Sequence, residues 1–205
     1  MRTIVLATRN AHKVDEIRDL LSDLPVRIVA ADEVEGLPEV EETGTTLEEN
    51  AELKANAIAR AAGLWALADD TGLEVEALGG APGVYSARYA FEGCSYEDNN
   101  RKLLSELADL PDDRRSARFR CVLALADPKG ILARVDGIRG GRILREIRGE
   151  GGFGYDPVFF DTELGKTFAE LSRREKGLVS HRGQALRRMR DEIARLLAES
   201  EETTA

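Results

Sequence analysis

The hydrophobic pattern at the start of the chain alternates apolar runs with a segment of helical periodicity. Residues 3–8 (TIVLAT) are β-branched and aliphatic, which is typical of a strand buried on both faces. After a polar loop at 9–12, apolar side chains recur at helical spacing over residues 14–24, which predicts an amphipathic helix. A second apolar run at 26–30 predicts another strand.

Capping residues mark the next helix. Thr46 and Glu49 have the spacing of a capping box at the start of an Ala-rich segment, and Gly63 can end that helix after Ala62. The apolar run at 64–68 then predicts a buried strand that leads into an Asp-Asp-Thr-Gly sequence.

The second half of the chain contains a hairpin pattern. Ser95 is placed to cap a helix. Apolar residues alternate along 119–125, the Asp-Pro-Lys-Gly sequence at 127–130 has the residues of a type I turn, and apolar positions resume at 131–135. These patterns predict two antiparallel strands.

The order of these elements predicts an α/β fold with a long mixed β-sheet flanked by helices. A further strand is expected at 157–160, and a terminal helix carries its apolar stripe over residues 186–196. The length of 205 residues fits one domain. We expect this domain to cover residues 1–198, with 199–205 as a disordered tail.

Composition and charge narrow the classes of function. Hydrophobic residues make up 42% and charged residues 33% of the chain, as in globular proteins. With 29 basic and 38 acidic residues, the net charge of -9 argues against a nucleic-acid-binding protein. Cys94 and Cys121 form neither a disulfide framework nor a metal-ligand spacing, and no apolar run approaches a membrane span. We therefore expect a cytoplasmic protein that binds no membrane.

The first candidate for chemistry is the loop between the first strand and helix. It contains six residues in sequence: Thr8, Arg9, Asn10, Ala11, His12 and Lys13. Backbone N–H groups and the positive end of the helix dipole favour phosphate at such a position, and Lys13 adds a charge. Alternatively, Asn10 and Lys13 serve only for capping and solvation.

The second candidate is the pair of carboxylates at Asp69 and Asp70. Adjacent carboxylates at the end of an apolar strand repel each other unless a cation or a proton balances them. Mg²⁺ typically binds one or two carboxylates together with substrate phosphates, and the acidic turn at Glu41 and Glu42 can supply a second carboxylate. The alternative is that residues 70–72 are only a turn and that the acidic segment around Glu41 only faces solvent.

The third candidate is the glycine-rich segment at 151–157. Its glycines allow the backbone to approach a flat ligand, Phe153 offers a stacking surface, and Asp156 can accept hydrogen bonds from a base edge. Alternatively, Phe153 and Tyr155 are only core anchors.

The fourth candidate is basic. Lys176, His181 and Arg182 belong to a segment, 166–195, with nine Lys or Arg against four acids, whereas residues 32–50 contain eight acids and no Lys or Arg. This division suits a polyphosphate bound by cations on one side and by a carboxylate-held metal on the other. The alternative, a solvated helix face, applies to Arg187, Arg188, Arg190 and Arg195.

Taken together, these segments resemble the inosine triphosphate pyrophosphatase family, also called XTP/dITP diphosphatases. The resemblance covers nearly the whole chain through ATRNAHKVDEI, EETGTTLEENAELKA, ADDTGLEVEALGGAPGVYSARY, ARFRCVLAL, GGFGYDPVFF and SHRGQAL. It implies two lobes around a central nucleotide-binding cleft, a homodimer, and hydrolysis of ITP, dITP or XTP to the monophosphate and pyrophosphate, which removes deaminated purines from the nucleotide pool.

The resemblance also implies roles for individual residues. Asp70 corresponds to the proton acceptor and, with Glu41, to the Mg²⁺ ligands; Glu42 is an alternative to Glu41, and Lys54 is a further phosphate contact. The implied substrate contacts are residues 8–13, Thr71, Phe153, Gly154, Tyr155, Asp156, Lys176, His181 and Arg182. Two positions depart from the family pattern, since Gly is common where Arg9 stands and Ser is common where Thr71 stands.

Base selection has a physical basis under this hypothesis. Hypoxanthine and xanthine present a carbonyl at C6 and an N–H at N1, so donors from His181 or Arg182 and an acceptor at Asp156 would be left unpaired by adenine. Two other classes of function remain open. One is a pyrophosphatase for pyrimidine or modified nucleotides, and the other is a nucleotide-binding module without catalysis.

Overall fold

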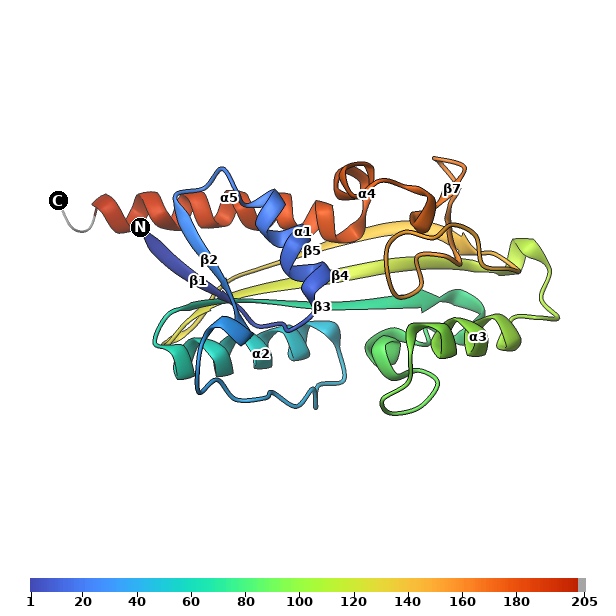
Figure 1. Cartoon of the computed structure of the whole chain (residues 1–205), viewed down its shortest axis with the longest axis horizontal. Coiled ribbons are helices and arrows are strands. Elements are labelled where there is room, and N and C mark those ends of the chain that lie inside the picture. The colour runs from blue at the N-terminus through green and yellow to red at the C-terminus, as the bar shows by residue number, and fades with distance from the viewer. Residues whose placement is uncertain (203–205) are drawn as a thin grey trace. The chain divides into compact units, whose positions relative to one another are not determined.

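The computed structural model describes the backbone of residues 1–202 and the side chains of residues 1–200. Its sheet has the strand order β2-β1-β3-β4-β5-β6-β7 within the described residues (Figure 1). The strands are β1 (Arg2–Leu6), β2 (Val26–Ala30), β3 (Trp65–Val75), β4 (Ser116–Asp127), β5 (Gly130–Ile143), β6 (Phe159–Asp161) and β7 (Lys166–Thr167). The helices are α1 (Ala11–Leu20), α2 (Leu47–Ala62), α3 (Tyr96–Glu106), α4 (Arg173–Val179) and α5 (His181–Glu202).

The sheet is mixed. Strand β1 pairs in parallel with β2 and β3, whereas β6 pairs antiparallel with β5 and β7. Parallel pairing needs a crossover connection, and α1 and α2 supply the two crossovers of the first three strands. The prediction of an α/β fold with a long mixed sheet and flanking helices is confirmed.

The described chain forms two compact units, each built from separate segments. Unit 1 contains Met1–Asp70, Cys121–Gly137 and the residues from Arg182 onward. Unit 2 contains Thr71–Arg120 and Ile138–His181. The chain passes from one unit to the other within β3, β4 and β5, and again after the first residue of α5.

The core of unit 1 joins the sheet to its helices. Alternate residues of β1, Ile4 and Leu6, pack in one cluster with Val14 and Ile17 of α1 and with Met189 of α5. Helices α1 and α5 lie on the same face of the sheet, and α2 lies on the opposite face (Figure 1). A strand here is therefore covered on both sides, which explains its uninterrupted apolar sequence.

The core of unit 2 is aromatic. Phe119 of β4, Phe159 of β6 and Phe168 pack with Leu103 of α3 and with Leu107, the C-cap of that helix. Phe159 and Phe168 are fully buried, and Phe119 is 6% exposed. Phe119 and Phe168 of this cluster lie beside His181, one of the predicted site residues.

Local capping explains the helix boundaries. The Thr46 hydroxyl accepts a hydrogen bond from the backbone N–H of Glu49, and Gly63 ends α2 with φ of 65°, a left-handed conformation that suits glycine. Ser95 caps α3 with a capping box. The predicted caps at Thr46, Gly63 and Ser95 are confirmed. The capping box predicted for Thr46 and Glu49 is not formed, because the Glu49 carboxylate accepts from the backbone N–H of Thr45 and not from that of Thr46.

Several boundaries differ from the prediction; the strand expected at 157–160, for example, is β6 (Phe159–Asp161). Strand β3 continues to Val75, so residues 70–72 belong to the strand and their interpretation as a turn is wrong. Cations from the flanking helices balance its carboxylates. Helix α5 includes residues 199–202 of the expected tail, whereas 203–205 lie outside the described residues. No helix within the described residues is both long and apolar enough to span a membrane.

Candidate functional site

The loop before α1 is folded by its own side chains. The Thr8 hydroxyl accepts a hydrogen bond from the backbone N–H of Asn10 at 3.2 Å. The Asn10 carboxamide oxygen, in turn, accepts from the backbone N–H groups of His12 at 3.0 Å and Lys13 at 3.4 Å. Asn10 is therefore the N-cap of α1, and the capping interpretation of this residue is confirmed.

The remaining residues of this loop face solvent or the interior of unit 1. Arg9, Ala11 and His12 are exposed, and the Arg9 guanidinium lies 3.7 Å from the Glu39 carboxylate. Lys13 points inward instead, with its side chain only 16% exposed.

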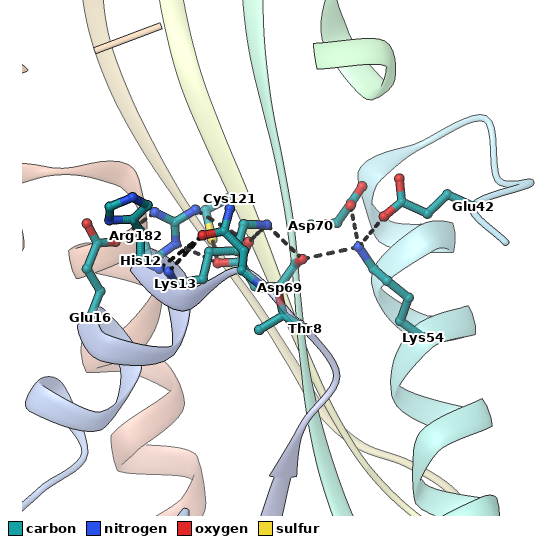
Figure 2. Close-up of polar contacts among 11 residues, drawn as sticks. Thr8, His12, Lys13, Glu16, Glu42, Lys54, Asp69, Asp70, Cys121 and Arg182 are labelled. Carbon is teal, nitrogen blue, oxygen red and sulfur yellow. Dashed lines mark hydrogen bonds and ion pairs between the residues drawn. The ribbon is translucent and has the colours of Figure 1, made fainter. Parts of the chain in front are cut away.

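Lys13 and Arg182 meet at a buried carboxylate. Asp69 receives the Lys13 ammonium on one oxygen at 2.5 Å and the Arg182 Nε on the other at 2.7 Å. Arg182 also donates to the Glu16 carboxylate at 2.7 Å, and the Cys121 thiol lies 3.4 Å from Asp69 (Figure 2). These five side chains come from α1, β3, β4 and α5, and we call them the Asp69 cluster.

Two cations keep Asp69 ionised. Burial opposes the charge of Asp69, but the nearby charges of Arg182 and Lys13 outweigh it and hold the pKa of this carboxyl well below its ordinary value. Because Arg182 is 2% exposed and its nitrogens contact two carboxylates, removing it would take a cation from both Asp69 and Glu16.

Asp70 belongs to a different group of charges. The Lys54 ammonium of α2 lies 2.6 Å from the Asp70 carboxylate and 2.7 Å from that of Glu42 (Figure 2). It also donates to the Asp69 backbone carbonyl at 3.2 Å. One cation thus holds two carboxylates from different segments, and we call Glu42, Lys54 and Asp70 the Asp70 cluster.

Burial changes the acidity of this cluster. Desolvation raises the pKa of Asp70, Lys54 lowers it, and the neighbouring Glu42 raises it again, so that it ends above its ordinary value. Burial also disfavours the charge of Lys54, but Asp70 and Glu42 outweigh it and raise the pKa of the ammonium. A buried carboxylate with a raised pKa is typical of a proton acceptor.

The acidic turn is fixed on the first turn of α2. The Asn50 carboxamide oxygen accepts from the backbone N–H of Gly44 at 2.8 Å, and the Glu49 carboxylate accepts from that of Thr45 at 2.6 Å. A Cβ atom at Gly44 would lie 2.6 Å from the Asn50 oxygen. Only glycine allows this approach, which holds Glu42 near Lys54.

In unit 2, the glycine-rich segment forms its own polar cluster. The buried Asp156 carboxylate accepts from the backbone N–H of Phe153 at 2.9 Å and from the Lys176 ammonium at 2.6 Å. The Lys176 ammonium also lies 4.6 Å from the centre of the Phe153 ring. Asp156 thus fixes both the loop and the cation that faces the aromatic ring.

The neighbours of Phe153 are structural anchors. The Gly154 carbonyl accepts from the Asn100 carboxamide of α3 at 2.9 Å. Tyr155 is 4% exposed and donates its hydroxyl to the Ser86 carbonyl at 2.9 Å.

His181, at the start of α5, is 2% exposed and stacks on Phe119 with ring centres 4.5 Å apart.

Comparison with known proteins gives the chain its family. The model of the Ham1 family matches residues 4–192. This chain belongs to the Ham1 family. The membership expected from the sequence motifs is therefore confirmed.

The relatives of this Ham1 family member match it over nearly their full length. A protein of Desulforamulus reducens named dITP/XTP pyrophosphatase is 50% identical over 198 residues, which cover 97% of this chain and 98% of that protein. The structure of a HAM1 protein from Coxiella burnetii has a TM-score of 0.88 and 42% identity over 95% of this chain and 100% of its own. The Staphylococcus aureus Ham1 structure has a TM-score of 0.84 and 41% identity over 97% and 100%, respectively.

Some of the predicted site residues lie together, and others do not. Lys13 and Arg182 share one carboxylate, Lys54 joins Asp70, and Lys176 joins Asp156. Glu41 is exposed, whereas Glu42 faces Lys54. Thr71 follows Asp70 on β3 and is half-buried.

Sequence reasoning missed several residues of these clusters. Glu16, Asn50, Asn100 and Phe119 were not among the predicted site residues, and Asp69 was noted only as the neighbour of Asp70. One signal was available: Glu16 lies three positions after Lys13 on a helix, where the two side chains share a face. The partners of Asn50, Asn100 and Phe119 could be found only in three dimensions.

The acidic groups fit a divalent metal ion shared with a substrate. Within the described part of the chain, no three His, Cys, Asp or Glu side chains are arranged to hold a metal ion. Glu42 and Asp70 provide two carboxylates that already share one cation. Mg²⁺ commonly takes one or two protein carboxylates and completes its shell with phosphate oxygens and water.

Proposed function

We propose that this Ham1 family member hydrolyses non-standard purine nucleoside triphosphates, namely ITP, dITP and XTP, to the nucleoside monophosphate and pyrophosphate. The observation that carries the proposal is the buried Asp70 carboxylate beside Glu42 and Lys54, which combines a proton acceptor with an anionic pair for a metal. The names of relatives that are half identical over nearly the whole chain support the same reaction.

We assign the metal to Mg²⁺, with Asp70 and Glu42 as its protein ligands. Glu42 replaces Glu41 in this assignment because Glu42 shares a cation with Asp70 and Glu41 is exposed. When bound, the ion would neutralise phosphate charge and polarise the phosphoryl centre. The Lys54 ammonium, which now joins the two carboxylates, would become available to a phosphate oxygen.

The chain's own residues perform the proton transfer and stabilise charge. Asp70 takes a proton from the water whose oxygen forms a bond to the α-phosphorus, while the bond from that phosphorus to the oxygen bridging to the β-phosphorus breaks. Pyrophosphate leaves with the electron pair of the broken bond. Lys13, at the start of α1, and Lys54 stabilise its charge.

We assign base selection to the polar cluster of unit 2. Phe153 offers a stacking face, the Asp156 carboxylate accepts the base N1–H, and His181 donates to the 6-oxo group. Adenine presents the opposite donor and acceptor pattern, so ATP would leave these buried groups unpaired. We expect its kcat/KM to be at least about a hundredfold lower than that of ITP.

The decisive experiment is product analysis with ITP, dITP, XTP, GTP, ATP and a pyrimidine nucleotide, each with and without Mg²⁺. Magnesium-dependent release of pyrophosphate and monophosphate from the 6-oxo purines supports the proposal. Preferred turnover of the pyrimidine nucleotide would assign a different pyrophosphatase, and binding without turnover would assign a non-catalytic module.

We also propose that the protein is a homodimer that acts in the cytoplasm on free nucleotides, without nucleic acid or membrane. Its net charge of -9 and the absence of a disulfide framework support this setting. Light scattering coupled to size-exclusion chromatography checks the dimer, since a mass near the 22.5 kDa of one chain would contradict it.

A further inference from the structure

The imidazole of His181 lies nearly parallel to two phenylalanine rings, those of Phe119 and Phe168. The ring of His181 lies almost parallel to that of Phe119, with centres 4.5 Å apart and planes 13° apart. Phe168 is nearly parallel to both rings, at 5.7 Å and 5° from Phe119 and at 6.1 Å and 11° from His181. His181 is therefore held by ring faces and not only by its position at the start of α5.

Phe119 is itself fixed. It lies on β4, is 6% exposed, and packs against Phe159 with ring centres 4.7 Å apart and planes tilted by 55°. Phe159 also packs on Phe168 at 4.8 Å. The Phe119 ring thus lies close to the rings of Phe159 and Phe168 as well as to that of His181.

The orientation of an imidazole needs such a support. The outer side-chain torsion of histidine has broad minima, so that packing rather than covalent geometry decides where its two nitrogens point. An aliphatic side chain at position 119 would fill part of the same volume but would offer no flat face. Parallel rings, in contrast, favour one plane for the imidazole.

We propose that Phe119 is a positioning residue for base selection, which acts by holding the His181 imidazole in the plane that presents its N–H to the 6-oxo group of the purine. This inference rests on the proposed function for its consequence in catalysis. The stacking itself does not, and it can be measured without substrate.

The first test is an NMR measurement of the imidazole. The chain has only two histidines, so a His181→Gln variant assigns the ring signals of His181. We expect ring currents to shift these signals in the wild type, and Phe119→Leu to move them toward the values of an exposed histidine. Phe159→Leu is the comparison variant: it removes a buried ring that packs on Phe119, so it should move the His181 signals less than Phe119→Leu does. Signals that do not move in Phe119→Leu, or that move equally in Phe159→Leu, would overturn the proposal.

The second test is the ratio of kcat/KM for dITP to that for dATP. We expect Phe119→Leu to lower this ratio by about three- to tenfold, Phe119→Tyr to preserve it, and Phe159→Leu to lower it less than Phe119→Leu does. In the His181→Gln background, Phe119→Leu should lower the ratio no further. A further loss in that background, or an equal loss in Phe159→Leu, contradicts a role through His181.

The two tests fail separately. Absence of dITP hydrolysis by the wild type would refute the proposed function and leave the NMR result to decide the stacking. Circular dichroism checks that each variant folds, and Phe119→Met, whose unbranched and flexible side chain adapts to the cavity, carries both tests if the leucine variant does not fold.

Discussion

Asp69 and Asp70 are neighbours in the chain, but their side chains meet different cations. Successive side chains of a strand point to opposite faces of the sheet. Asp69 therefore reaches Lys13 and Arg182, from α1 and α5, whereas Asp70 reaches Lys54 of α2 on the other face. Adjacent acids that would repel each other in a turn thus serve two separate sites.

Replacing the carboxylate of Asp70 tests its role as proton acceptor. We expect Asp70→Asn to lower kcat for dITP by about 10²- to 10⁴-fold, the usual contribution of general base catalysis. Nucleotide binding should persist, because the other proposed substrate contacts remain. Steady-state kinetics and equilibrium titration with dITP measure the two effects, with Asp109→Asn at an exposed position as the control. Turnover near that of the wild type would refute the assignment.

Arg182 is predicted to contribute to stability through its buried ion pairs. Arg182→Met leaves Asp69 and Glu16 without this cation, so the free energy of unfolding should fall by about 3–5 kcal/mol. Arg190→Met on the same helix is the matched control: Arg190 pairs with Asp23 at the surface, where such a pair contributes about 0–1 kcal/mol. Urea unfolding measures both variants. Equal losses would mean that the buried pairs have no special role.

At the scale of elements, α2 supports the candidate metal site through two successive turns. Its first turn holds the acidic turn through Asn50 and Glu49, and Lys54, one turn later, holds Glu42 itself. The N-cap of α2 at Thr46 and the site therefore share one helix end. A change at this end should affect catalysis before it affects the fold.

Gly44→Ala tests this support. The added Cβ would meet the Asn50 oxygen at 2.6 Å and the Glu49 Cβ at 2.7 Å, so the acidic turn must move. We expect kcat/KM for dITP to fall by about tenfold or more, as for other residues that orient metal ligands. Gly140→Ala is the control because its Cβ would meet no atom within 4 Å. Unchanged kinetics in Gly44→Ala would show that this turn does not position Glu42.

At the scale of the molecule, buried acid and base pairs link stability to pH. Burial opposes the ionisation of Asp69 and Asp161, but nearby cations outweigh it and lower the pKa of each carboxyl. These cations are Arg182 and Lys13 for Asp69, and Arg139 for Asp161. When the pKa of a carboxyl is lower in the folded state than in the unfolded state, ionisation stabilises the fold at every pH above the unfolded-state pKa of about 4. This stabilisation is lost as the pH falls toward the folded-state pKa.

We therefore predict that the free energy of unfolding decreases as the pH falls below about 4. The decrease should be shallower in Asp69→Asn, which has no proton to take up at this position. Asp70 has a raised pKa, so its contribution to stability changes with pH in the opposite direction. It is present in both proteins and does not affect their comparison. Urea unfolding between pH 3 and pH 7 measures the slopes. Parallel curves for the two proteins would contradict the assignment.

The sequence alone determined the features that depend on residues close together in the chain. Helical periodicity, the caps at Asn10, Thr46 and Ser95, and the left-handed Gly63 involve contacts within a few positions, so their patterns are visible in order. The class of fold followed from the succession of these elements. The family motifs pointed to Asp70, Lys13 and Asp156 as residues of the site.

Only the tertiary structure decided which partner each of these side chains has. Glu42 rather than Glu41 faces Asp70 because Asn50 and Lys54 hold the acidic turn on α2. Arg182 contacts a carboxylate 113 positions earlier in the chain. Such pairings depend on how the sheet brings helices together, and burial then sets their energies, so no local pattern along the chain encodes them.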